Sequence, residues 1–227
     1  MDRIIIPICV EALLADGRSV DQNRVPVYEP DYRKTSYVSL LGSKNTPGDF
    51  ERGEVHRAGA HLHFILPDAL THAGDEGYPA VPDRYLVTRL YGKKDGKIAV
   101  KCSLVESNFM SRDSSYSDSV TIPLFQEKDL RKNWRYLGRS YEIENVPEKQ
   151  ESDEYLENLT ALGPGDPMFA AYYPSCSSVF GFYDPLEDVE PGTSLTYFVA
   201  GYYSDPGKDP FSEVKSDEDM EAILAEM

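Results

Sequence analysis

A β-hairpin is the feature that most constrains how this chain folds. Two runs rich in β-branched and aromatic residues, 84–91 and 97–105, flank a short polar segment that ends in Asp95 and Gly96. An Asp-Gly pair in such a segment is a strong local signal for a tight turn between antiparallel strands, because glycine tolerates the left-handed backbone conformation that hairpin turns need. The sequence therefore predicts an antiparallel hairpin over residues 84–105.

Segments of similar character recur along the chain. Apolar and β-branched residues predict strands over 3–14, 61–66, 120–125, 134–143, 178–183 and 193–203. Helical spacing of apolar residues predicts short helices from Ser152 to Leu162, from Asp166 to Tyr173 and in the acidic tail 216–227. The expected fold class is α+β and strand-dominated, with an antiparallel β-sheet and a few short helices.

The length of 227 residues is sufficient for one large domain. At this size roughly 70% of the surface of the unfolded chain is buried on folding, so a disulfide or metal is not needed for stability. We expect residues 1–227 to form a single domain. The apolar side of the tail helix continues to Met227, which predicts that the chain is the N-terminal module of a longer protein.

Charge is unevenly distributed along the chain. Residues 1–139 contain 20 Lys and Arg against 19 Asp and Glu, whereas residues 140–227 contain 3 against 20, and the formal net charge is −16. An acidic surface repels phosphate and anionic lipid, so we expect no binding to nucleic acid or membrane. The acidic part either keeps the protein soluble or docks a protein partner, a basic one in particular. The oligomeric state is left open.

The cysteines and the N-terminal segment indicate a cytoplasmic protein. Cys9, Cys102 and Cys176 are an odd number and lie far apart, which predicts reduced thiols. The apolar run near the N-terminus is short and contains Pro7, unlike a signal peptide, and no run of 18 apolar residues exists. No cofactor-binding motif is present, and no catalytic residue stands out.

Two histidines have a spacing that suits metal binding. His61 and His63 lie two apart on a predicted strand, so both imidazoles lie on one face, and Asp68 is a candidate third ligand. No histidine follows His72, however, so the further ligand that comparable metal sites take from a second strand is missing. The alternative is that these histidines are hydrogen-bonded residues on the polar face of the strand.

Tyrosines are in surplus, with 16 against one tryptophan, and many lie in the acidic part of the chain. Rings with a polar edge beside carboxylates are typical of sugar-binding and protein-binding surfaces, although tyrosine also fills half-buried strand positions. Arg84 and Arg89 are five residues apart, so they lie on opposite faces of their strand, and each is expected to pair locally with an acid. The candidate binding residues are Tyr172, Tyr173, Tyr202, Tyr203 and Asp205.

Four segments are distinctive: 59–72 (GAHLHFILPDALTH), 79–89 (PAVPDRYLVTR), 161–174 (ALGPGDPMFAAYYP) and 197–206 (YFVAGYYSDP). Together they resemble the N-terminal region of a family of long bacterial proteins of unknown function. In the family pattern the positions of Phe64, Tyr85 and Tyr202 are commonly Trp and that of Asp83 is commonly Asn. The resemblance implies a leading module of a larger polypeptide, associated with phage-tail-like secretion loci, and it implies no catalytic residue.

These features favour a non-enzymatic interaction or scaffolding module of a larger bacterial protein, with the acidic, tyrosine-rich part as its contact surface. Two alternatives belong to other classes. One is a small metal-dependent enzyme centred on His61 and His63, and the other is a carbohydrate-binding module that uses surface tyrosines.

Overall fold

The computed structural model describes residues 8–15, 57–75, 77–112, 121–123, 134–163, 177–209, 212 and 214–216. Within these residues the fold is strand-dominated, all of its paired strands are antiparallel, and its helices are two short 3-10 turns, η1 (Asp68–Thr71) and η3 (Ile143–Asn145). No helix in this part of the chain is long and apolar enough to cross a membrane.

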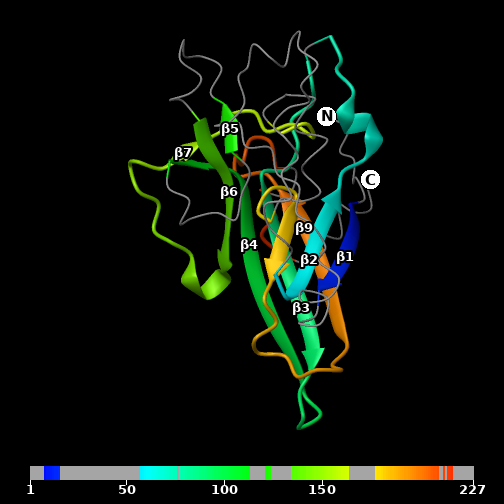
Figure 1. Ribbon diagram of the computed structural model, residues 1–227. Helices are drawn as coiled ribbons and strands as arrows, with labels where there is room; N and C mark the ends of the chain where they lie inside the picture. The colour runs from blue at the N-terminus through cyan, green and yellow to red at the C-terminus, as the bar shows by residue number, and fades with distance from the viewer. Residues whose placement is uncertain are drawn as a thin grey trace, which may run out of the picture.

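The smaller sheet has three strands in the order β1-β2-β8 (Figure 1). β1 (Cys9–Ala15) pairs with β2 (Gly59–Ile65), and β2 pairs with β8 (Gly181–Asp184). Leu62 and Phe64 of β2 are buried whereas His61 and His63 are partly exposed, so the prediction that both imidazoles lie on one face is confirmed.

The larger sheet follows the order β5-β6-β4-β3-β9 and stands behind the smaller one in Figure 1. Its strands are β3 (Arg84–Gly92), β4 (Ile98–Ser111), β5 (Thr121–Pro123), β6 (Trp134–Glu142) and β9 (Leu195–Tyr202), and the two-residue β7 (Glu154–Tyr155) pairs with β4. The predicted hairpin is confirmed as β3 and β4. Its turn is closed by a bond from the Lys93 N–H to the Lys97 carbonyl at 2.7 Å, and Gly96 has a φ of +79°.

The core lies between the two sheets. Side chains from the facing sides of both form one buried cluster, so each sheet covers the apolar inner face of the other. The cluster consists of Leu62, Phe64, Leu66, Val81, Tyr85, Val87, Val105, Leu137, Leu159, Ala161, Val179, Phe180 and Phe182.

An irregularity in β4 creates a notch in the larger sheet. Glu106 pairs with Arg139 and Met110 with Leu137, so three residues of β4 lie opposite Gly138 alone. Gly138 has a φ of +87°, and a side chain there would collide with the carbonyl oxygen of Ser178. The chain before β8 fills the notch, and Phe180 donates its N–H to the hydroxyl of Ser107 at 3.3 Å.

The helix predicted from Ser152 to Leu162 is wrong. Residues 151–153 form a turn, 154–155 form β7, and the rest of the segment is extended or turning. Leu159 belongs to the core cluster and Leu156 packs against it partly buried, and Leu156 donates its N–H to the Asn108 carbonyl at 2.8 Å. The helices predicted over 166–173 and in the tail after Ser216 lie outside the described residues.

Candidate functional site

The predicted metal ligands are only partly brought together. His61 and His63 share one face of β2, but His61 donates from Nε2 to the Arg57 carbonyl at 2.8 Å and its ring lies 4.8 Å from that of Tyr183. The Asp68 carboxylate contacts Thr71 in the η1 turn and His72 directly after it. Burial lowers the pKa of His63, opposed by the charge of Glu11. No group of three or more metal-ligating side chains occurs in the described ranges, and the metal site stays a prediction.

The predicted binding tyrosines divide into two groups. Tyr172 and Tyr173 lie outside the described residues. Tyr202 is 37% exposed at the end of β9, whereas Tyr203 donates its hydroxyl to the Ala80 carbonyl at 3.2 Å. Asp205 accepts from the Gly207 N–H at 2.9 Å, so its carboxylate closes a turn. Tyr202 is the more exposed of the two described tyrosines.

An apolar surface lies on the side of the larger sheet that faces away from the smaller sheet. Ile98 is 72% exposed, Val100 is 61% exposed and Phe198 is 58% exposed. Strand register places Leu90 beside Val100, and Leu86 beside Leu104. Leu86 and Leu90 are half-buried and lie on β3, between the residues of β4 and those of β9. We call this surface the apolar outer face: Leu86, Leu90, Ile98, Val100, Leu104, Phe198 and Tyr202.

The apolar outer face is uncharged over three successive cross-strand rows. These rows run from β9 through β3 to β4 and are Ala200–Leu86–Leu104, Phe198–Thr88–Cys102 and Thr196–Leu90–Val100. Large exposed apolar patches on proteins commonly mark interaction sites. Other large apolar side chains that are exposed in the described part of the chain are Leu13, Leu14, Ile143 and Val146.

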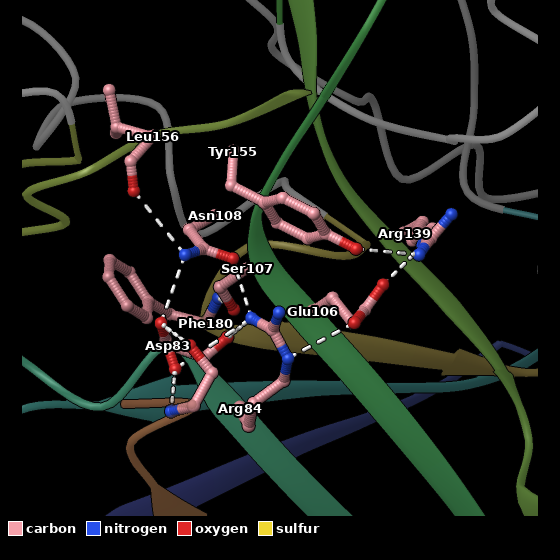
Figure 2. A network of polar contacts seen from close by, with 10 residues as sticks. Asp83, Arg84, Glu106, Ser107, Asn108, Arg139, Tyr155, Leu156 and Phe180 are labelled. Atoms are coloured by element: carbon pink, nitrogen blue, oxygen red, sulfur yellow. Dashed lines mark hydrogen bonds and ion pairs between the residues drawn. The ribbon is translucent and has the colours of Figure 1, made fainter. Parts of the chain in front are cut away.

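A buried row of charges bounds the apolar outer face at one end. Arg84, Glu106 and Arg139 are direct cross-strand neighbours on β3, β4 and β6, and each is at most 8% exposed. Glu106 forms an ion pair with Arg84 Nε at 3.1 Å and accepts a hydrogen bond from Arg139 Nε on its other side (Figure 2). Burial lowers the pKa of Arg139, but the hydrogen bond and charge of Glu106 outweigh it and raise this pKa. One carboxylate thus holds two guanidinium groups between three strands.

Further polar groups complete this network and fix its surroundings. Asn108 accepts from Arg84 Nη1 at 2.5 Å and donates to Asp83 at 2.9 Å and to the Leu156 carbonyl at 3.3 Å (Figure 2). Asp83 in turn accepts from the N–H and hydroxyl of Ser204, at 2.8 and 2.6 Å. The network therefore ties the chain that follows β9 to β3 and β4.

A second buried arginine links the two sheets. Arg89 lies on the opposite face of β3 from Arg84, as predicted, and is 2% exposed. Its Nη1 donates to both oxygens of Asp184 at 2.7 Å, and its Nη2 donates to Asp188 at 2.5 Å. Burial acts to lower the pKa of Arg89, but these two acids outweigh it and raise the pKa. Arg89 thus pairs with acids, but these acids are remote in sequence, so the predicted local pairing is wrong for Arg89.

A pocket of about 170 Å³ lies beside this arginine, between the sheets. Its charged lining groups are already paired, Arg89 with Asp184 and Lys101 with Glu142. The two basic and two acidic groups balance, so the pocket offers no net charge to an ionic ligand. Its lining residues are Val87, Arg89, Lys101, Ser103, Ser140, Tyr141, Glu142, Phe182, Tyr183, Asp184 and Pro185.

Sequence reasoning did not identify the apolar outer face. A signal for it exists in β3, where both alternating sets of residues are apolar: Tyr85 and Val87 on the inner face, and Leu86 and Leu90 on the outer face. A strand that is apolar on both faces indicates that both faces are covered, by the protein itself or by another molecule.

Comparison with known proteins gives no relative. No family model matches the chain. No curated protein matches it, and no solved structure matches it. The site is therefore interpreted from its own geometry and chemistry.

Proposed function

We propose that this chain is a non-enzymatic interaction module of a larger bacterial protein, and that it binds a basic protein partner through the apolar outer face. The observation that carries the proposal is the exposure of Ile98, Val100 and Phe198 on a face whose three central rows carry no charge. Burying such a face against a partner gains roughly 25 cal/mol for each square ångström of apolar surface removed from water.

The arrangement of charge supports a basic partner. The rows of the apolar outer face are neutral, while the chain as a whole has a net charge of −16. Opposite charge steers encounter and excludes like-charged competitors, whereas apolar contact at the centre supplies most of the binding free energy. Binding should accordingly weaken with salt without being abolished by it, because exposed charges are screened within about 8 Å at physiological ionic strength.

Two valines provide a matched test. Val100 is 61% exposed on the apolar outer face and Val146 is 49% exposed elsewhere, so Val100→Thr and Val146→Thr make the same nearly isosteric change at two surface sites. Affinity capture with the full chain should retain a partner with the wild type and with Val146→Thr, and recover less of it with Val100→Thr. A partner retained equally by both variants, or the absence of any partner, would contradict the proposal.

The cysteines add a footprint to the same experiment. Cys102 lies on the same face, beside Thr88 at the β4 end of the row Phe198–Thr88–Cys102, and Cys9 is exposed on β1 in the other sheet. A partner on the proposed face should slow alkylation of Cys102 and leave that of Cys9 unchanged. Equal protection of both thiols, or none, would place the partner elsewhere.

A further inference from the structure

β9 is an edge strand without the usual protection. It pairs with β3 along one side, and within the described ranges no strand pairs with its other side. Its eight residues, Leu195–Tyr202, contain no proline and no charged residue. The other outermost strands of the two sheets are blunted: β5 has three residues and ends at Pro123, β8 has four residues and ends at Asp184, and β1 carries Glu11. Natural sheets generally protect long uncharged edges, because unpaired N–H and C=O groups invite another strand.

We propose that an extended segment of the partner pairs with β9 as an additional strand of the larger sheet, with its apolar side chains continuing the apolar outer face and basic residues at both of its ends. This inference rests on the proposed function and specifies how the partner binds. Strand addition combines main-chain hydrogen bonds, which give affinity, with alternate side-chain contacts, which give specificity. At about 3.4 Å per residue, the eight residues of β9 offer roughly 27 Å of edge.

The alternation of β9 suits this mode of binding. Thr196, Phe198, Ala200 and Tyr202 point to the exposed side, and the residues between them point to the core. A strand laid beside β9 therefore places every second side chain next to Phe198 and Ala200, where no charge opposes an apolar group. Its other side chains lie at the margin of the core.

Acidic connections precede and follow β9. Residues 184–190 contain Asp184, Glu187, Asp188 and Glu190 and no basic residue, and residues 204–209 contain Asp205 and Asp209 against Lys208. Pairing with Arg89 and Lys94 neutralises part of the first group, and Glu187 is exposed. Lysine or arginine at both ends of an added strand would meet these acids. A second copy of this chain would instead bring acidic connections against each other in either strand direction.

β9 is held in place at both ends, so little ordering is required on binding. Near its start the Tyr197 hydroxyl donates to Asp184 at 2.9 Å. Just after its end Ser204 donates twice to Asp83, and Tyr203 donates to the Ala80 carbonyl. A preformed edge reduces the entropic cost of association.

Synthetic peptides test the proposal directly on the full chain. The probe is a peptide of about twelve residues with alternating valine and threonine between two pairs of lysines. Amide hydrogen exchange read by NMR should show fast exchange for alternate amides of β9 in the free protein and about tenfold or greater slowing on addition of the peptide. No binding, or protection confined to other strands, would overturn the proposal.

Backbone methylation separates strand addition from contact through the face alone. N-methyl groups on alternate peptide residues should weaken binding at least about tenfold in the register that faces β9 and have little effect in the other register. If Val100→Thr weakens binding but both methylated peptides bind alike, the apolar outer face is a binding site and strand addition is refuted. If neither Val100→Thr nor backbone methylation of the peptide weakens binding, the proposed function is refuted as well.

Two further controls address charge and self-association. A peptide with glutamate in place of lysine should bind at least about tenfold more weakly at low salt, and equal binding would refute the requirement for basic ends. Sedimentation of the protein alone should give a monomer. A dimer that Phe198→Lys dissociates would show that a second copy occupies β9 and would overturn the proposal.

Discussion

Glu106 holds two buried arginines, and its neutralisation should be costly. In Glu106→Gln the shape is kept, but Arg84 and Arg139 lose the carboxylate that lies between them. Removing one partner of a buried ion pair costs about 3–5 kcal/mol, because the remaining charge is buried without compensation. Asp83 lies 3.7 Å from Arg84 and Asp153 lies 3.6 Å from Arg139, and both remain in the variant. We therefore expect the lower end, about 3 kcal/mol.

Urea unfolding followed by circular dichroism measures this loss. With a slope of about 2–3 kcal/mol per molar urea, 3 kcal/mol lowers the midpoint by roughly 1–1.5 M. Glu190→Gln is the matched control, because Glu190 is 62% exposed and pairs with Lys94 on the surface, where such pairs contribute at most about 1 kcal/mol. If the two variants unfold within about 1 kcal/mol of each other, the network in Figure 2 does not hold the strands as described.

Three further substitutions test other parts of the fold by the same unfolding assay. Gly138→Ala should cost at least about 3 kcal/mol, because φ is +87° and a Cβ collides with backbone. Gly96→Ala, at φ +79°, has open space around the added Cβ and should cost about 1 kcal/mol. Similar costs for the two variants would refute the close approach of the backbone to Gly138 in the notch. Tyr85→Phe should leave stability unchanged or raise it by about 1 kcal/mol, because the buried hydroxyl has no hydrogen-bond partner among the described residues; a clear loss would refute this. Burial acts to raise the pKa of Asp188, but hydrogen bonds, chiefly from Arg89, lower it. The loss of stability in Asp188→Asn should therefore be full above about pH 4 and become smaller below it. A loss of stability that is the same at every pH would contradict this.

The hairpin was predictable because its signal is local. Asp95 and Gly96 between two β-forming runs are enough to specify a turn, and the structure has that turn. Its register was not predictable to the residue. A two-residue turn at Asp95 and Gly96 would place Arg84 opposite Ser107, whereas the observed longer turn places it opposite Glu106. The charge row therefore depends on one residue of loop length.

The helix predicted after Ser152 failed because tertiary contacts outweighed local spacing. Asp153 reads as a residue of a first helical turn, but its carboxylate lies 3.6 Å from Arg139 Nη2 and its N–H bonds to the Gln150 carbonyl in a turn. The Leu156 N–H bonds to Asn108, and the Leu159 carbonyl accepts from Val81, so the segment is extended against the sheet. Helix propensity is a weak preference that partners of this kind override.

Of the residues that form the candidate site, only the surface tyrosine Tyr202 was predicted from the sequence. Tyr202 was among the predicted binding residues and lies on the apolar outer face, but Val100 and Phe198 read from the sequence as ordinary strand residues. Whether such residues face the core or solvent depends on which side of the sheet the second layer covers. That choice is made by β2 and β8, which are remote in sequence from β3 and β4.

An uncharged edge beside an apolar face is a risk for aggregation, and the charge pattern of this chain offers a reason why it is tolerated. Identical copies repel through a net charge of −16 each and through the acidic connections that precede and follow β9. The same charges attract a segment with basic ends, so they discriminate between self-pairing and partner binding without altering β9 itself. It follows that neutralising Glu187, Asp205 and Asp209 together should promote self-association at low salt while the fold is retained. The oligomeric state of that variant measures how far charge alone prevents β9 from pairing with a second copy.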